Sequence, residues 1–287
     1  MTTHWHNIGN TSIKLQTGVK SQTVNICHPN SRSTDYEHKF RIVDPAEFLS
    51  VADLTTCDSV GNLIRDVTTR GFREEPGGSH GTLMSVLPPH ESWGTPLVPL
   101  IDDAIAGLVE SFLGHPYRHR VEHSLHCDLF ARLTDAVQQG QSQSLVELDE
   151  FAYGCVQKEW PETIARADKN GRRGNFDLSI LTPPAPEQTI TLDHFLGGCI
   201  RPFAAFELGL DYGEDHFSND CDKLENSKIS NAYVLHFARR DNAAQEQAIE
   251  SAKERIRSGT NLKILACILG RDELVTNIDA IPHRLSQ

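Results

Sequence analysis

The sequence predicts an α/β domain built around a central mixed sheet, and two observations support this. From Pro99 onward, segments with helical periodicity alternate with short apolar runs that are typical of buried strands. Their order is helix, three strands, helix, strand, helix and strand, which is the pattern of a sheet covered by helices. Two breaker clusters, "REEPGGSHG" and "PPHESWGTP", precede this series. We therefore divide the chain into an N-terminal region of uncertain fold, residues 1–96, and an α/β domain, residues 97–287.

Helices are predicted where apolar residues recur every three or four positions. Residues 99–114 form the first helix, with Gly114 as its C-terminal cap. Residues 116–140 form the second, which starts on a proline and ends on a glycine. Further helical segments are expected at 192–196, within 219–228 and at 242–259, the last opened by Asn242 and Gln245 at the spacing of a capping box.

Strands are predicted from apolar runs that are too short for helices. These runs are residues 151–160, 175–181, 201–210, 231–238 and 261–269. Two of them carry a lone carboxylate in an otherwise apolar setting, Asp177 in "NFDLSIL" and Glu207 in "AAFELGL". A carboxylate in a buried strand is costly unless it is paired, hydrogen-bonded or bound to a metal.

Composition restricts the classes of function. The seven cysteines are an odd number without a CxxC pair, which indicates a reduced compartment. No long apolar run and no signal-peptide pattern is seen, so we expect a cytoplasmic protein with no membrane partner. With a net charge of −12, any nucleic-acid contact must be local. Two stretches are basic: "HPYRHR" at 115–120, and the loop that holds Arg166, Lys169, Arg172 and Arg173.

The two strand carboxylates predict a cation site. If Asp177 and Glu207 lie on adjacent strands, their charges destabilise each other, and a hard divalent cation relieves that repulsion. Mg²⁺ is commonly held by one or two carboxylates with water and substrate phosphate. Glu122, beside the buried stripe of the 116–140 helix, is a candidate third ligand.

The order of these elements resembles the core of the PD-(D/E)XK nuclease superfamily. The resemblance covers about residues 99–269 and includes "QKEWPE", "RRGNFDLSIL", "FAAFELGL", "DCDKLENSK" and "NAYVLHFAR". It implies a restriction-endonuclease-like αβββαβ core in which Asp177 is the motif aspartate and Glu207 the acid of E-x-K. Glu122 would be the helix acid, with Glu159 as its substitute.

The chain departs from the superfamily pattern at the motif lysine. Gly209 occupies that position, two residues after Glu207, and glycine cannot orient water or stabilise phosphate charge. Some members supply the ammonium from the following helix, where this chain has Lys223 and Lys228. We take Lys223 as the candidate.

The resemblance implies phosphodiester hydrolysis with Mg²⁺ or Mn²⁺ held by Asp177, Glu207 and Glu122, and with Lys223 as a catalytic residue. DNA is the expected substrate, cut as an endonuclease, and pairing into a homodimer is a common way to cut both strands. The basic loop, with Arg166, Lys169, Arg172 and Arg173, would contact backbone phosphates, which give affinity without sequence preference.

Two alternatives remain open from the sequence. "HRVEH" matches the H-x-x-E-H pattern of inverted zinc peptidases, in which His119 and His123 would bind zinc from one helix face and Glu122 would be the base. That short pattern arises easily by chance in a chain with fourteen histidines. The second alternative is a nuclease-like module that binds nucleic acid and has lost catalysis at Gly209.

Overall fold

The structure is a computed structural model that describes residues 85–162, 164 and 174–282, together with the backbone of the strands that precede them. The chain divides into two compact units. One combines Met1–Leu87 with Ile190–Ile200, and the other combines Pro88–Thr189 with Arg201–Gln287.

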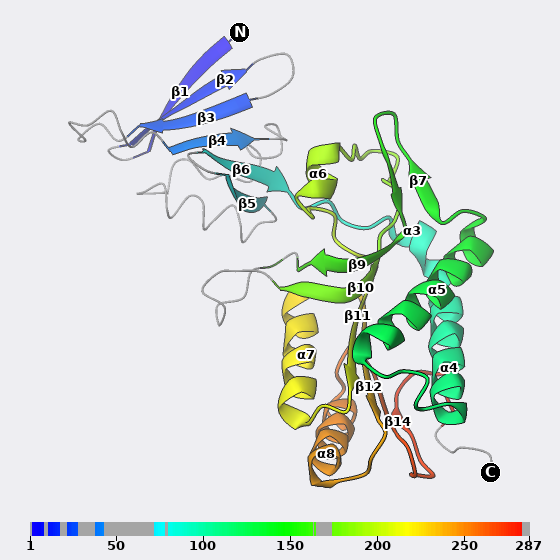
Figure 1. Ribbon diagram of the computed structural model, residues 1–287. Helices are drawn as coiled ribbons and strands as arrows, with labels where there is room; N and C mark the ends of the chain where they lie inside the picture. Colours follow the sequence, from blue (N-terminus) through cyan, green and yellow to red (C-terminus); the bar gives the residue numbers. More distant parts are fainter. Residues whose placement is uncertain are drawn as a thin grey trace. The chain divides into compact units, whose positions relative to one another are not determined.

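The N-terminal unit is built on a six-stranded sheet in the order β1-β2-β3-β4-β6-β5 (Figure 1). β4 and β6 pair in parallel, and the other neighbours pair antiparallel. The short helix α6 (Leu192–Leu196) belongs to the same unit and begins with the capping box of Thr191 and His194. The strands are β1 (Thr2–Ile8), β2 (Thr11–Thr17), β3 (Gln22–Cys27), β4 (His38–Ile42), β5 (Phe72–Gly77) and β6 (His80–Ser85).

The larger unit holds a second six-stranded sheet, in the order β14-β13-β12-β11-β10-β9. β9, β10 and β11 are antiparallel neighbours, β11, β12 and β13 are parallel, and β14 is antiparallel to β13. The predicted α/β architecture with a mixed sheet is therefore confirmed. The strands are β9 (Val156–Pro161), β10 (Asn175–Ile180), β11 (Ala204–Leu210), β12 (Asn231–Ala238), β13 (Lys263–Ile268) and β14 (Val275–Thr276).

Helices cover both faces of this sheet. Figure 1 shows α4 (Val98–Gly114) and α5 (Glu122–Gln141) on one face, and α7 (Glu214–Ser227) and α8 (Ala243–Arg257) on the other. The short α3 (Glu91–Gly94) and η1 (Thr95–Leu97) lead into α4, and the hairpin of β7 (Leu145–Glu147) and β8 (Ala152–Gly154) follows α5. Within the described residues, no helix combines the length and the apolar character needed to cross a membrane.

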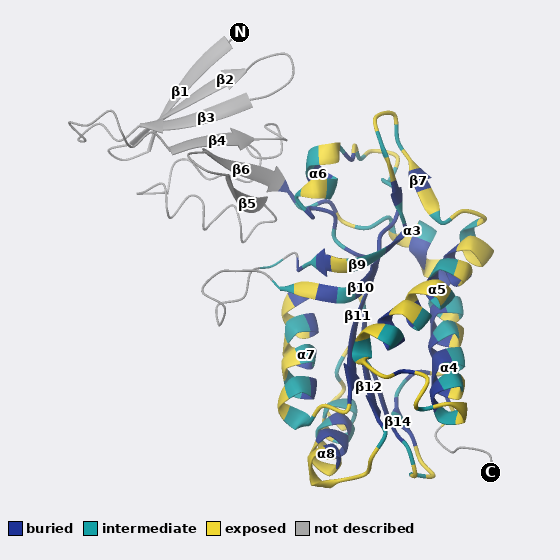
Figure 2. Ribbon diagram, viewed as in Figure 1, coloured by how far each residue is buried: buried dark blue, intermediate teal, exposed yellow. Residues whose placement is uncertain are grey.

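The core lies along the central parallel strands. Every residue of β11 is buried, and β12 is buried from its second residue onward (Figure 2). On α4, the residues that predicted its helical period, Ile101, Ile105, Leu108 and Phe112, face this core with no exposed surface. Strands buried on both faces are expected in a sheet whose parallel connections are helices.

Several elements differ from the sequence prediction. The C-terminal cap of α4 is His115 rather than Gly114, and α7 begins at Glu214, five residues before the predicted segment. α5 begins at Glu122, six residues after the predicted start at Pro116, because Val121 is extended at φ −133° and ψ 157°. The predicted strand 151–160 is divided into β8 and β9, which are separated by Cys155. The Cys155 amide donates to the Ser144 carbonyl, and the Cys155 carbonyl accepts from the Leu181 amide. Asn242 caps α8 as predicted, but the Gln245 side chain bonds to His236 and the Tyr212 carbonyl, so the capping box is not reciprocal.

Candidate active site

Asp177 lies where the ladders on both sides of β10 are interrupted. Leu178 is paired with β9 and with β11, whereas Asp177 is paired with neither strand of the described sheet. If each pairing register is continued by one residue from Leu178, Asp177 is opposite Glu207 on β11 and opposite Glu159 on β9. The Asp177 side chain links β10 to β11 in place of a backbone hydrogen bond. Its Oδ2 accepts a hydrogen bond from the Leu208 amide at 2.8 Å. Three carboxylates therefore meet where the sheet opens.

Glu207 is buried beside a lysine from the next helix. Its side chain is 3% exposed, and the Lys223 ammonium from α7 lies 2.7 Å from Oε1 and 2.8 Å from Oε2. Burial raises the pKa of Glu207 well above its ordinary value, and the nearby Lys223 charge opposes that rise. The Lys223 ammonium also lies 5.9 Å above the ring of Phe176, so the charge is held between a carboxylate and an aromatic face.

Gly209 lies in a tight space, where a lysine side chain would require His236 to shift. A β-carbon at Gly209 would lie 3.3 Å from His236 Nδ1, 3.7 Å from the Tyr212 ring and 3.8 Å from His216 Nδ1. The first distance is tighter than ordinary van der Waals contact, and His236 is held in place by its bond to Gln245. The ammonium beside Glu207 therefore comes from α7 rather than from β11.

The N-terminal turn of α5 brings Glu122 and His126 to the open end of the sheet. His126 Nε2 lies 3.6 Å from Glu122 Oε1 and 3.6 Å from Asp177 Oδ2, beyond hydrogen-bond distance from both. The His126 side chain is 5% exposed, and neither ring nitrogen has a hydrogen-bond partner. A buried neutral imidazole with a free lone pair beside carboxylates has the chemistry of a metal ligand.

Glu159 completes a set of candidate ligands. Atoms of His126, Glu159 and Asp177 lie within 4.8 Å of one another, close enough to share one ion. Glu159 has a φ of +55° in the middle of β9. A left-handed conformation at a residue other than glycine costs about 1–3 kcal/mol and is concentrated at functional sites. The strained backbone is thus found directly across from Asp177.

Burial shifts the pKa values of the three groups at this end of the sheet, Asp177, Glu122 and His126. Burial raises the pKa of Asp177 to about 6, and the bond from Leu208 and the Lys223 charge oppose the rise. Burial and the Asp177 charge raise the pKa of Glu122 to about 7. Burial, Lys158 and His123 lower the pKa of His126 to about 4, so the imidazole is neutral at pH 7 and able to coordinate. The residues present therefore fit a divalent cation.

A histidine–aspartate pair on α7 borders the same site. His216 Nδ1 lies 3.0 Å from Asp220 Oδ2, and this bond raises the pKa of His216. The ring of Tyr212 stacks on His216 with centroids 4.1 Å apart and planes at 4°. None of these three residues was predicted as a site residue, although the four-residue spacing of His216 and Asp220 on a helix was a usable signal.

The structure brings together Asp177, Glu207 and Lys223, and it places Glu122 next to them. It also brings His126 to the same place, 3.6 Å from Asp177 Oδ2. Lys228, the other candidate lysine, is exposed at the C-terminal cap of α7. The four basic residues proposed to contact phosphates, Arg166, Lys169, Arg172 and Arg173, lie outside the described residues.

The helix that the zinc peptidase pattern requires does not include His119. Because α5 begins at Glu122, His119 and His123 do not share a helix face. His119 is buried, with Nε2 3.6 Å from Asp128 Oδ2, while the His123 ring contacts Lys158 Nζ at 2.6 Å. Two imidazoles that lie beside different residues, Asp128 and Lys158, are not arranged as a zinc pair.

Comparisons of the chain with known proteins do not assign this site. Searches against protein-family models, curated proteins and solved structures gave no match.

Proposed function

We propose that the larger unit is a metal-dependent nuclease of the PD-(D/E)XK type, which hydrolyses phosphodiester bonds of nucleic acid, with DNA as the expected substrate. The order α5, β9, β10, β11, α7, β12 supports the proposed αβββαβ core, with the β7–β8 hairpin inserted after α5 and α6 inserted between β10 and β11. β9 to β11 form the antiparallel part of that core, and β12 returns parallel to β11.

The observation that carries the proposal is the arrangement of Asp177, Glu207 and Lys223. Two carboxylates occupy facing positions at the interrupted end of adjacent strands, and an ammonium pairs with the more buried one. A charged group buried at this depth is costly, and such groups cluster where a site needs them. A merely structural ion pair would not require the open ladder, the unpartnered His126 or the strained Glu159.

Asp177, Glu159 and His126 would hold the cation, Mg²⁺ or Mn²⁺, with Glu122 and Glu207 beside them. Such a cation, when bound, neutralises charge on the phosphoryl group and lowers the pKa of bound water. The Leu208 amide fixes the orientation of the Asp177 carboxylate. Glu122, with a pKa of about 7, can accept a proton from water at neutral pH, which is the property of a general base. The Lys223 ammonium holds Glu207 and brings positive charge toward the site of the phosphate.

Nuclease assays on plasmid DNA and on RNA, with Mg²⁺, Mn²⁺ or no metal, test the proposal. We expect metal-dependent cleavage by the native chain and its loss in Asp177→Asn. The amide oxygen of asparagine can still accept the Leu208 bond, so the fold should survive. Asp135→Asn, on the exposed side of α5, is the matched control. Cleavage that persists in Asp177→Asn, or no cleavage by the native chain with any metal, would refute the proposal.

A further inference from the structure

A second feature of the larger unit is a pocket of about 410 Å³ beyond the end of β11. It is formed where β11 and β12 end and α8 begins, and it is lined by Tyr117, Asp211, Arg239, Arg240, Asn242 and Gln245. Tyr117 comes from "HPYRHR", the basic stretch that the candidate active site does not use. The pocket therefore joins three separate parts of the chain.

The walls of this pocket are fixed by internal bonds. Arg239 pairs with Asp211 through its Nε at 2.7 Å and through a second guanidinium nitrogen. Its third nitrogen donates to the carbonyls of His119 at 3.0 Å and Arg120 at 3.4 Å, which ties the loop before α5 to the end of β12. Gln245 is buried and donates to the Tyr212 carbonyl at 2.8 Å. The pocket is thus organised before any ligand arrives.

The groups left over are cationic and aromatic. Arg240 is exposed, and no hydrogen bond or ion pair with another described residue engages its guanidinium. Arg118 and Arg120 are also exposed on the adjacent loop, and Tyr117 is 74% exposed. The acid that lines the pocket, Asp211, is already paired with Arg239, and Asp241, next to Arg240 in the chain, is paired with Arg271 at 2.7 Å.

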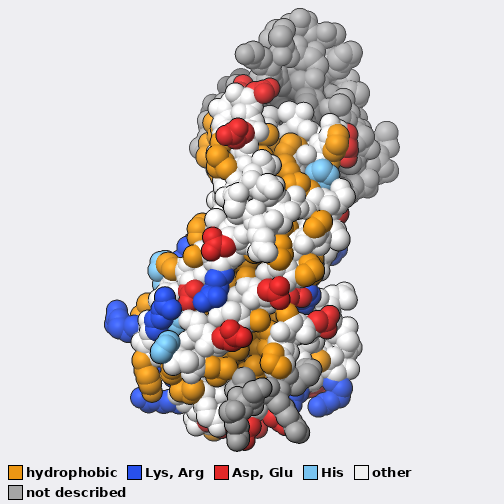
Figure 3. Space-filling view, turned by 90° about the vertical axis from the view of Figure 1, so that its right-hand side faces the viewer, with side chains coloured by type: hydrophobic (Ala, Val, Ile, Leu, Met, Phe, Trp, Pro, Cys, Tyr) orange, Lys and Arg blue, Asp and Glu red, His pale blue; other side chains and the backbone are white. Residues whose placement is uncertain are grey.

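This concentration of positive charge is local in a chain of net charge −12. On the face shown in Figure 3, Lys and Arg side chains stand among acidic and hydrophobic ones in small groups. Arginines beside an exposed tyrosine are the combination by which proteins hold single-stranded nucleic acid, with cations on phosphates and a ring on a base.

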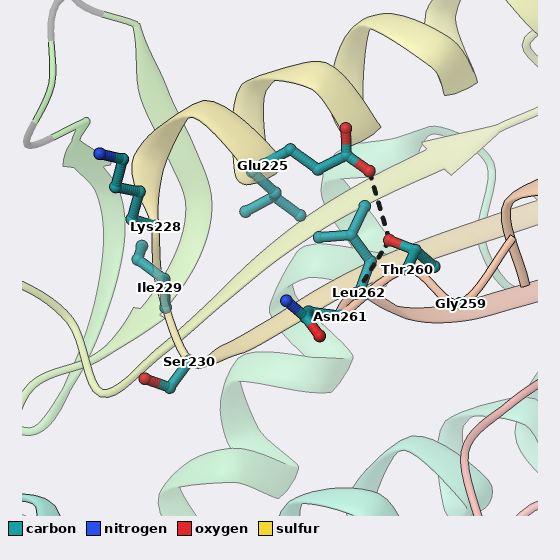
Figure 4. Close-up of a pocket in the computed structure, with 9 residues that line it drawn as sticks. Glu225, Lys228, Ile229, Ser230, Gly259, Thr260, Asn261 and Leu262 are labelled. Carbon is teal, nitrogen blue, oxygen red and sulfur yellow. Dashed lines mark hydrogen bonds between the residues drawn. The ribbon is translucent and has the colours of Figure 1, made fainter.

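The larger pocket, at the opposite end of α8, has electrostatic properties that disfavour anions. It has a volume of about 770 Å³ and is lined by the last turn of α7 and the residues between α8 and β13, where Glu225 accepts a bond from Thr260 at 3.2 Å (Figure 4). The C-terminal ends of α7 and α8 present carbonyl groups there, which disfavour anions. The smaller pocket lies instead at the N-terminal end of α8, where the positive partial charge of the helix dipole favours phosphate.

We infer that the pocket of Tyr117 and Arg240 binds a single-stranded segment of nucleic acid, with Tyr117 stacked on an unpaired base and Arg240 on a phosphate. This inference rests on the proposed function for its substrate class. β11 connects the two sites: Leu208 binds the Asp177 carboxylate, and Asp211 lines the pocket. Three residues of strand span about 10 Å, which is about three nucleotides of a B-form strand. A tyrosine can stack on a base only where the duplex is open, so the pocket favours single-stranded ends or gaps over continuous duplex.

Binding of fluorescent oligonucleotides, followed by anisotropy with EDTA present, tests the inference without requiring cleavage. The probes are a single strand and a blunt duplex of the same sequence. We expect tighter binding of the single strand, and a rise in its Kd of about tenfold in Tyr117→Ala. Arg240→Ala should weaken binding and lower the slope of log K against log salt by about 0.7, the loss of one phosphate contact. Tyr117→Ala should leave that slope unchanged.

Matched controls separate the pocket from general losses of charge or ring surface. Arg257→Ala removes an exposed arginine at the other end of α8, and Phe130→Ala removes a half-exposed ring on α5. Both should bind as the native chain does. If Tyr117→Ala and Arg240→Ala behave like these controls, or if the native chain prefers duplex or binds no probe, the inference is wrong.

The same set of proteins distinguishes this failure from failure of the proposed nuclease. Asp177→Asn should bind the single strand normally and fail to cleave it. Pocket variants that bind weakly while the native chain cleaves nothing would support the pocket and refute the nuclease. Native cleavage with pocket variants indistinguishable from controls would support the nuclease and refute the pocket.

Discussion

Lys223 and Glu207 form an ion pair inside the larger unit, with the ammonium nitrogen 2.7 Å from Oε1 and 2.8 Å from Oε2. The side chains are 12% and 3% exposed, so both charges are largely removed from water. Although Glu207 Oε1 lies close to the Lys223 ammonium, it accepts no hydrogen bond and keeps its lone pairs free. Because removal of one partner leaves the other charge buried alone, this pair is the most sensitive point of the site.

Replacing Lys223 by methionine should therefore cost both stability and activity. We expect the free energy of unfolding at pH 7.5 to fall by about 3 kcal/mol, the usual loss when one partner of a buried pair is removed. Metal-dependent cleavage should fall by at least about a hundredfold, because the charge next to the phosphate is lost. Chemical denaturation and initial cleavage rates measure the two effects.

Two further variants show whether the loss of stability in Lys223→Met comes from leaving the Glu207 carboxylate buried without a partner. Adding Glu207→Gln to Lys223→Met should restore most of the stability and none of the activity. Lys228→Met, at the exposed end of the same helix, should behave like the native chain. If the double variant is no more stable than Lys223→Met, Glu207 does not carry a buried charge that Lys223 balances.

A lysine placed at the motif position should not replace Lys223. The space at Gly209 is bounded by His236 Nδ1, which lies 3.3 Å from the point that a β-carbon would occupy, and by the stacked rings of Tyr212 and His216. Gly209→Lys in the Lys223→Met background should leave cleavage at the level of Lys223→Met. It should also lower the free energy of unfolding further, by about 1–3 kcal/mol of overpacking, as chemical denaturation would measure. Recovery of cleavage would show that β11 can supply the ammonium after all.

The sequence was sufficient for the order of the main helices and strands of the larger unit and for the strand carboxylates, but not for the N-terminal sheet, the β7–β8 hairpin or β14. An apolar run such as that of β11 predicts a buried strand, and a carboxylate within it is visible because it breaks the run. The acid positions Asp177 and Glu207 could therefore be named without coordinates. The resemblance indicated a lysine on the following helix, Lys223 or Lys228, and only the structure shows that Lys223 is the one that pairs with Glu207.

The remaining site residues depend on distances that no local pattern encodes. His126 contributes to the site because the start of α5 crosses the open end of the sheet, and the predicted helix start at Pro116 obscured that relation. In the sequence, Glu159 cannot be distinguished from the many exposed acids. Its positive φ and its position opposite Asp177 are visible only in the structure. Backbone strain and ladder interruptions arise from tertiary packing, so periodicity cannot reveal them.

His126 predicts a preference between metals. Imidazole is a better ligand for transition metals than for Mg²⁺, whereas carboxylates suit both Mg²⁺ and Mn²⁺. In calorimetric titrations, the native chain should bind Mn²⁺ more tightly than Mg²⁺. His126→Ala should weaken Mn²⁺ binding about tenfold or more and change Mg²⁺ binding much less. His123→Ala, which removes an exposed imidazole near the same turn, is the control. Equal losses for the two metals would exclude His126 as a direct ligand.

The raised pKa of Glu122 predicts a pH-dependent cost to the metal-free fold. Its pKa moves from an ordinary 4.5 to about 7, so the folded chain binds the proton more readily than the unfolded chain. Its contribution to stability is therefore complete below about pH 4.5 and is lost as the pH rises through about 7. Glu122→Gln keeps the shape and removes the charge. At pH 8 with EDTA present, we expect this variant to be more stable than the native chain by on the order of 2 kcal/mol.

The difference between Glu122→Gln and the native chain should shrink as the pH falls toward 4.5, where the native carboxyl is protonated in both states. Denaturation midpoints at half-unit steps from pH 8 to pH 5 measure it. Glu254→Gln, an exposed acid of α8, should show no such trend. Saturating Mn²⁺ should reverse the order at pH 8, because a bound cation compensates the charge that Glu122 carries and glutamine gains nothing from it. A constant difference across this range would mean that Glu122 is not held at a desolvated, acidic site.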